Sequence, residues 1–169
     1  MAEPELSSRL GGLHILAVDD EEDILDTITD VLDEAEVARA KTYDEALEKL
    51  KDRQYDLAIL DIMGVNGLNL LTETVNKGIP TIMLTAHAMN PETLKTSITK
   101  GALSYLPKEE LSNLPEFVDD LLEAVESGAS TWKRLFNRLG KFFEKSFGPG
   151  WDKNDPDFWR AYGYWGTPF

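Results

Sequence analysis

The chain contains no cysteine and no long apolar run. Without cysteine it can form neither a disulfide framework nor a thiolate metal site. No stretch approaches the about 18 consecutive apolar residues of a membrane-spanning helix. Residues 1–10 also lack a basic segment followed by an apolar one, so we expect no secretion signal. These absences favour a cytoplasmic protein.

Histidine and positive charge are also scarce. The two histidines, His14 and His87, do not have the spacing of metal ligands, and we expect them to be structural or exposed. Residues 1–127 carry 10 Lys or Arg and 27 Asp or Glu, a balance of −17, whereas residues 128–169 carry 7 and 4, a balance of +3. So acidic a first part is not expected to bind nucleic acid.

What the sequence does contain is a regular alternation of apolar runs and helical patterns. Its 169 residues suffice for one buried core with an appendage. Short apolar runs predict strands at 14–18, 37–40, 57–60, 80–84 and 103–107. Apolar spacing or end signals predict one helix after each strand. In chain order, the helices are marked by Ile24, Leu25, Ile28, Val31, Leu32 and Ala35; by Ala46, Leu47 and Leu50; by Leu68, Leu70, Leu71 and Val75; by Asn90-Pro91-Glu92 at the start and Gly101 at the end; and by Phe117, Val118, Leu121, Leu122 and Val125. This order predicts an α/β fold with a parallel sheet.

Polar residues stand directly after four of the predicted strands: Asp19 and Asp20, Asp61, Thr85, and Lys108. In a parallel sheet with helical crossovers, side chains just beyond the strand ends gather in one crevice. Three carboxylates in one pocket repel one another unless a cation neutralises them. Mg²⁺ prefers oxygen ligands and commonly bridges carboxylates and phosphate, so the set suggests phosphoryl chemistry with an aspartate as nucleophile.

Each of these residues also has a simpler interpretation. The acidic residues from Asp19 to Glu22 fit a helix N-terminus, where the macrodipole favours negative charge. Asp61 fits a turn, Thr85 a strand end, and Lys108 a solvated charge beside two glutamates. Only their joint arrangement favours function.

The same positions resemble the response-regulator receiver domain of two-component signalling. Val18-Asp19-Asp20-Glu21 resembles the family's acidic pair, and Leu60-Asp61-Ile62-Met63 its phosphoacceptor segment. Thr85-Ala86 resembles the switch hydroxyl and its small neighbour, Lys108 the family's lysine, and Tyr105 its switch aromatic. The resemblance covers about residues 12–127. It implies a doubly wound, flavodoxin-like, five-stranded parallel sheet in the order 2-1-3-4-5, with residues 128–169 as a C-terminal helical extension.

The resemblance also implies a mechanism. Asp20, Asp61 and the backbone carbonyl of Met63 would bind Mg²⁺, and Asp19 would contribute through water. Asp61 would accept a phosphoryl group from a histidine kinase or phosphotransfer protein. Lys108, Thr85 and the backbone of Ala86 would contact that group, while Thr85 and Tyr105 would switch a protein-binding surface. The chain would then be a phosphoacceptor signalling protein and not an enzyme acting on other substrates.

Two departures from the family leave alternatives open. The loop from Asp61 to Gly67 is two residues shorter than usual, and Pro107 precedes Lys108 where the family commonly has a proline after it. The short loop supports a receiver-like scaffold that binds partners without being phosphorylated. A phosphohydrolase with an aspartyl-phosphate intermediate is a third possibility, although such enzymes place a second aspartate where this chain has Met63.

The C-terminal extension, residues 128–169, has a different composition from the rest. It holds 12 of the 16 aromatic residues. Residues 131–147 predict a basic amphipathic helix, and Asp155-Pro156 begins a short helix with Phe158, Trp159 and Tyr162. So aromatic a segment should be buried, either on its own receiver or against a downstream protein target or a second copy in a homodimer. An anionic membrane surface is the least favoured partner, and no DNA-recognition helix is present.

Overall fold

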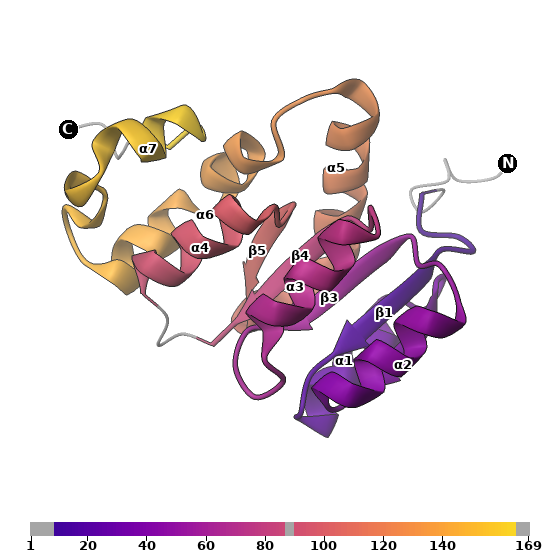
Figure 1. The fold of residues 1–169 in the computed structure, drawn as a ribbon. Coiled ribbons are helices and arrows are strands. Elements are labelled where there is room, and N and C mark those ends of the chain that lie inside the picture. Colours follow the sequence, from indigo (N-terminus) through magenta and orange to yellow (C-terminus); the bar gives the residue numbers. More distant parts are fainter. Residues whose placement is uncertain (1–8, 87–89, 165–169) are drawn as a thin grey trace, which may run out of the picture.

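The computed structural model describes residues 9–86 and 90–164, so His87 lies outside the described residues. The strands are β1 (His14–Val18), β2 (Glu36–Ala40), β3 (Leu57–Asp61), β4 (Thr81–Thr85) and β5 (Ser104–Pro107). The helices are α1 (Glu22–Val31), α2 (Tyr43–Asp52), α3 (Gly67–Asn76), α4 (Pro91–Lys100), α5 (Leu114–Ser127), α6 (Thr131–Phe147) and α7 (Pro156–Ala161). Two 3₁₀ helices, η1 (Lys108–Asn113) and η2 (Trp151–Asn154), complete the described part (Figure 1).

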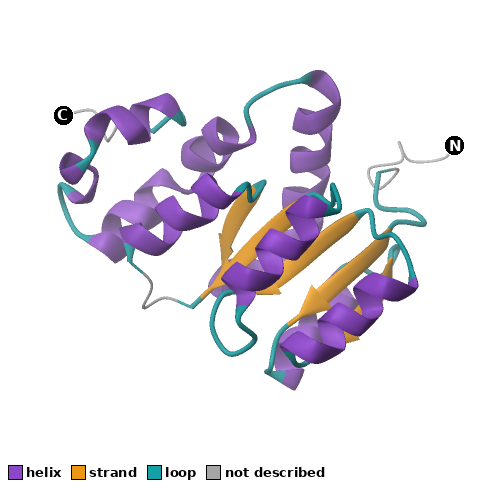
Figure 2. Ribbon diagram, viewed as in Figure 1, coloured by secondary structure: helices purple, strands orange, loops and turns teal. Residues whose placement is uncertain are grey.

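The five strands form one parallel sheet in the order β2-β1-β3-β4-β5, which confirms the predicted fold class and strand order. On one face α1 contacts α5, and on the other α2, α3 and α4 contact one another in series, so helices cover both faces of the sheet (Figure 2). Because both faces are covered, β3 and β4 are buried at every position. This burial explains why the sequence shows them as continuous apolar runs.

The ends of α4 show how local sequence sets an element. The Asn90 side chain accepts a hydrogen bond from the Thr93 backbone N–H at 3.0 Å, and Pro91 occupies the first turn. Gly101 ends the helix with a φ of 104°, a conformation that favours glycine. Both predicted ends of this helix are therefore confirmed.

Several boundaries differ from the prediction by a few residues. Asp61 and Thr85 are the last residues of their strands, because the sheet hydrogen bonding continues one residue beyond each apolar run. Val75 and Val125 lie on their predicted helices but are 36% and 47% exposed. Ala35 lies beyond α1, although it packs against the core. Neither 3₁₀ helix was predicted, because such short elements lack an apolar period.

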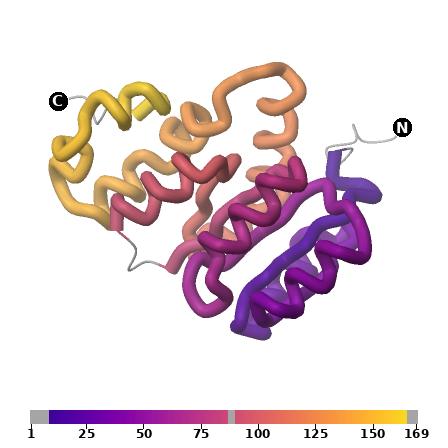
Figure 3. The backbone as a smooth tube through the Cα atoms, viewed as in Figure 1, coloured from indigo at the N-terminus to yellow at the C-terminus, as the bar shows by residue number. Residues whose placement is uncertain are grey.

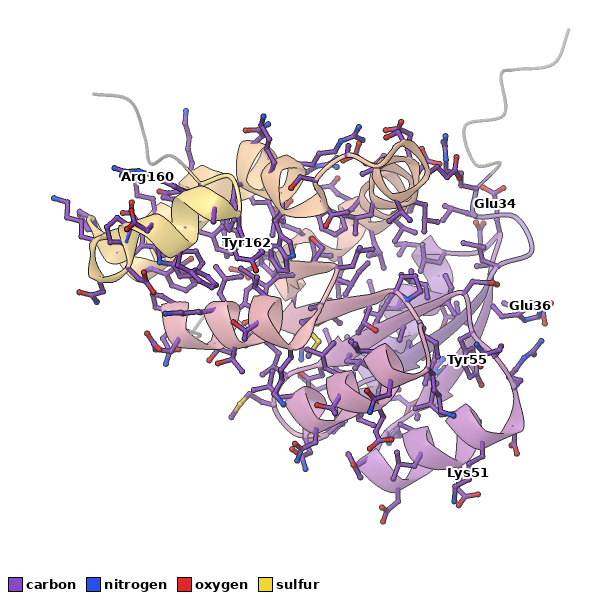
Figure 4. All side chains as sticks on the ribbon, turned by 45° about the horizontal axis from the view of Figure 1, so that its top comes forward. Glu34, Glu36, Lys51, Tyr55, Arg160 and Tyr162 are labelled. Atoms are coloured by element: carbon purple, nitrogen blue, oxygen red, sulfur yellow. The ribbon has the colours of Figure 1, made fainter. Side chains whose placement is uncertain are left out.

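Residues 128–164 of the C-terminal extension fold back onto the β5 end of the sheet, opposite α1 and α2 (Figures 1 and 3). The helix predicted over 131–147 is present as α6, and it contacts β5 and α5. In Figure 4, Arg160 and Tyr162 mark the C-terminal segment, at the opposite end of the molecule from Glu34, Glu36 and Lys51. Arg160 is exposed, whereas Tyr162 packs against the core. Of the arrangements expected from the sequence, the structure shows the intramolecular one.

Within the described ranges, no helix is both long and apolar enough to cross a membrane.

Candidate functional site

The register of the sheet brings the predicted polar residues to one edge. Val18 of β1 pairs with Leu60 of β3, so the next residues, Asp19 and Asp61, lie at the same level on neighbouring strands. On the other side of β3, Asp61 pairs with Leu84, the residue before Thr85. Strand β1 has its crossovers to β2 and β3 on opposite sides, which makes this edge the topological switch point where doubly wound sheets bind ligands.

The acidic pair after β1 is divided between the interior and the surface. Asp19 is fully buried, and its Oδ1 accepts a hydrogen bond from the Glu21 backbone N–H at 2.8 Å. Asp20 is exposed but lies against the loop after β3: a Cβ added to Gly64 would be 2.7 Å from the Asp20 carboxylate. Gly64 has a φ of 78°, so glycine suits both its backbone and the close approach of Asp20. The short loop thus packs directly on the acidic pair.

Lys108 joins the carboxylates into one cluster. Its Nζ is 3.0 Å from Asp19 Oδ2, 3.3 Å from Asp61 Oδ1, and 3.0 Å from Glu21 Oε1. Only the Glu21 contact has hydrogen-bond geometry, so Asp19 and Asp61 are held as ion pairs. The side chain of Lys108 is 15% exposed and enters the cluster from the first residue of η1, directly after β5.

One positive charge does not neutralise this cluster. Burial, together with the nearby charge of Asp19, raises the pKa of Asp61 to about 6 despite the opposing effect of Lys108. Burial likewise raises the pKa of Asp19. Burial acts to lower the pKa of Lys108, but the contacts with the carboxylates of Asp19, Glu21 and Asp61 outweigh it and raise that pKa. The site is therefore short of positive charge.

The donor set fits a hard divalent cation. Asp19 Oδ2 is buried without a hydrogen-bond partner, so it retains a free acceptor site. Oxygens of Asp19, Asp20 and Glu21 lie within 4.8 Å of one another, as ligands of one ion would. The Met63 carbonyl accepts a hydrogen bond from the Val65 N–H at 2.9 Å, which leaves it one lone pair. Oxygen donors in an acidic, partly buried setting are what Mg²⁺ prefers.

Thr85 and Tyr105 form a second, uncharged part of the site. The Thr85 hydroxyl donates to the Ala86 carbonyl at 2.9 Å and accepts a hydrogen bond from the Tyr105 hydroxyl at 3.4 Å. Thr85 is 3% exposed and Tyr105 is fully buried. Burial raises the pKa of Tyr105 to about 12, so its hydroxyl keeps its proton at neutral pH. The tyrosine is therefore turned inward and bound to the threonine.

The structure brings Asp19, Asp61 and Lys108 into direct contact, places Asp20 beside the loop that contains Met63, and puts Thr85 at the end of the neighbouring strand. The sequence reasoning missed Glu21 as a partner of Lys108. Its place directly after the acidic pair was the available signal, but there it fits equally well the start of α1.

Residues 15–119 match the family model of the response regulator receiver domain, which covers more than half of the chain. The chain belongs to the response regulator receiver family.

Solved structures similar to this chain support the same family assignment. A CheY-like response regulator receiver domain protein from Methanospirillum hungatei JF-1 is 28% identical with a TM-score of 0.58, and the match covers 69% of this chain and 99% of that one. NtrX from Brucella abortus, solved in complex with ADP, is 29% identical with a TM-score of 0.55, covering 69% of this chain and 29% of that one. The chemotaxis protein CheY4 of Vibrio cholerae is 25% identical with a TM-score of 0.59, covering 66% of this chain and 99% of that one.

A search of curated proteins found no match. About a third of the receiver chain lies outside these structural matches, and the family model ends at residue 119. Helices α6 and α7 therefore have no counterpart in the family model.

Proposed function

We propose that this chain is a response regulator receiver whose Asp61 accepts a phosphoryl group from a histidine kinase or phosphotransfer protein in a Mg²⁺-dependent reaction. The observation that carries the proposal is that the carboxylates of Asp19 and Asp61 both lie within 3.3 Å of Lys108 Nζ. The three residues come from the ends of three different strands. Ordinary turn or cap residues have no reason to converge in this way. A nucleophilic carboxylate beside a cation-binding pair and a fixed amine suits acyl phosphate formation.

In the proposed reaction an Asp61 carboxylate oxygen attacks the phosphorus of a phosphohistidine. The new oxygen–phosphorus bond replaces the nitrogen–phosphorus bond, and the histidine ring leaves as the neutral imidazole after taking up a proton. Asp61 must be ionised to attack, and its raised pKa of about 6 still leaves it mostly ionised at neutral pH. Lys108, already 3.3 Å from Asp61, is placed to pair with the transferred group.

Asp20, Asp61 and the Met63 carbonyl are proposed to hold Mg²⁺, with Asp19 acting through a bound water. The cation would supply the missing positive charge and screen the carboxylates from the incoming phosphoryl oxygens. Glu21 binds Lys108 from the solvent side, and we expect it to compete with the phosphoryl group for that amine.

Thr85 and Ala86 are proposed to complete the phosphoryl contacts. The Thr85 hydroxyl would exchange its hydrogen bond with the Ala86 carbonyl for one to a phosphoryl oxygen, and the Ala86 backbone N–H would donate to another. This exchange would change the environment of Tyr105, whose hydroxyl now donates to Thr85. A change at Asp61 would thus reach the protein surface near β5.

Acetyl phosphate with Mg²⁺ tests this function by intact-mass measurement. We expect a mass gain of one phosphoryl group in the native protein and in Asp30→Asn, an exposed control on α1, but none in Asp61→Asn or when EDTA replaces Mg²⁺. Multiple turnover of phosphate esters would instead indicate a phosphohydrolase. No modification by acetyl phosphate or by a phosphorylated kinase would indicate a receiver-like scaffold.

A further inference from the structure

Helix α1 begins beside the candidate site, and the side chain at its N-cap position is used in that site. Glu21 occupies this position with φ −94° and ψ 116°, an extended conformation from which a short polar side chain caps a helix. In α2, α4 and α6 the N-cap side chains of Thr42, Asn90 and Ser130 accept a hydrogen bond from the first turn. The Glu21 side chain makes no such bond. It reaches instead to Lys108, at the start of η1.

The surroundings of Lys108 show what this contact means for a phosphoryl group. An ammonium group has three N–H donors. Three carboxylates already lie around this one, Asp19 and Glu21 at 3.0 Å and Asp61 at 3.3 Å. A phosphoryl oxygen would be a fourth acceptor for the same three donors. We therefore expect one carboxylate to give up its place when that oxygen binds the amine.

Of the three carboxylates, Glu21 is the one that can leave. Asp19 is fully buried, and its Oδ1 is held by the Glu21 backbone N–H at 2.8 Å. Asp61 is 4% exposed at the end of β3 and is itself the proposed phosphoacceptor. The side chain of Glu21 is 61% exposed, whereas that of Lys108 is 15% exposed. Rotation of the Glu21 side chain therefore moves its carboxylate into solvent without opening the core.

The strength of the contact fits a competitor that is easily displaced. An ion pair with one mostly exposed partner changes an equilibrium by about fivefold at most. We propose that Glu21 is a positioning residue that acts through Lys108, holding the amine and competing for it, and so limits how tightly the site holds a phosphoryl group on Asp61. The proposal rests on the function proposed above. It assigns the uncapped start of α1 to the control of the site.

The test uses the full chain with saturating Mg²⁺ and beryllofluoride, which mimics an acyl phosphate, and fluorine NMR measures the affinity for beryllofluoride. We expect Glu21→Gln to bind beryllofluoride about fivefold more tightly than the native protein, because a neutral amide is a weaker acceptor for the amine. Asp23→Asn is the matched control, since it removes the same charge from an exposed side chain in the first turn of α1. Its affinity should stay within about twofold of the native value.

A second variant, Glu21→Asp, separates the contact from the charge. Aspartate keeps the negative charge, but it is one methylene shorter and suits the N-cap position, so we expect its carboxylate to turn to the first turn of α1 and away from Lys108. Binding of beryllofluoride should again be tighter, by about threefold. Before beryllofluoride is added, the NMR signal of the Lys108 ammonium group should shift in this variant and stay in place in Asp23→Asn.

Magnesium affinity excludes the main alternative role of Glu21. Its oxygens lie within 4.8 Å of those of Asp19 and Asp20, as those of a third metal ligand would. A metal ligand would make Glu21→Asp bind Mg²⁺ about tenfold more weakly in calorimetric titration, and that result would overturn the proposal. We expect a change within about twofold, because the charge is retained.

Two further results separate this proposal from the one on which it rests. If the native protein binds beryllofluoride and both Glu21 variants bind it equally or more weakly, the competition is refuted and the phosphoacceptor function stands. If neither the native protein nor Glu21→Gln binds beryllofluoride in saturating Mg²⁺, the proposed function fails and this inference fails with it.

Discussion

Replacing Asp61 by asparagine should stabilise the folded protein at neutral pH in the absence of divalent cations. The change removes the charge but keeps the shape of the side chain. Asp61 is 4% exposed and stands beside the buried carboxylate of Asp19, so its negative charge is costly in the folded state. Lys108 offsets only part of that cost, and after the substitution it keeps its contacts with Asp19 and Glu21.

The size and sign of this effect follow from the pKa of Asp61. Burial and the charge of Asp19 raise that pKa from 3.8 to about 6 in the folded protein. Between about pH 4 and pH 6 the folded state therefore binds more protons than the unfolded state, and stability falls as the pH rises. Above pH 6 the full cost of the ionised group is present, about 3 kcal/mol at about 1.4 kcal/mol for each pKa unit. Well below pH 4 the group is neutral in both states, and the cost disappears.

The assay is urea unfolding with EDTA at pH 7.5 and at pH 4, comparing the native protein with Asp61→Asn. We expect the variant to be more stable by about 3 kcal/mol at pH 7.5 and by less than about 1 kcal/mol at pH 4. Asp30→Asn, an exposed change on α1, should stay within about 0.5 kcal/mol of the native protein at both pH values. Equal or lower stability of Asp61→Asn at pH 7.5, or a gain that persists at pH 4, would refute the reasoning.

Two further predictions concern glycines near the site. Gly64→Ala should weaken Mg²⁺ binding by about tenfold in calorimetric titration, because its Cβ would lie 2.7 Å from the Asp20 carboxylate at a backbone φ of 78°. An unchanged affinity would show that Asp20 is not part of the metal site. Gly67→Ala should destabilise the fold by about 4 kcal/mol in urea, because its Cβ would overlap the Asp61 backbone carbonyl. Gly11→Ala, which has nothing within 4 Å, is the control for both, and a mild effect at Gly67 would show that the β3–α3 loop can shift.

Much of the candidate site was predictable from the sequence, because the polar side chains stand at strand ends and the parallel sheet brings those ends together. Asp19, Asp61, Thr85 and Lys108 each follow or end a buried run, and a parallel sheet brings such positions to one edge. The sequence did not predict which contacts form there. That Lys108 pairs with Glu21 as well as with the aspartates depends on how η1 begins, and no apolar pattern marks that helix.

For the C-terminal extension, too, the local structure was predictable from the sequence, but the surface against which it packs was not. Its main helix was predicted over residues 131–147 and is found there, since an apolar period is a local signal. Where it docks was left open among several surfaces, because an aromatic face specifies burial but not its partner. The hydrogen bonds of Thr131 and Trp132 to the turn before β5 decide it.

By itself the sequence determined the strands, the main helices, the α/β class and the polar side chains that gather at one edge of the sheet, because these depend on local periodicity and on side-chain chemistry. Only the tertiary structure decided that Tyr105 lies between Thr85 and Phe143. Such a contact joins residues 20 and 38 positions apart, and it exists only once the sheet and the extension have packed together.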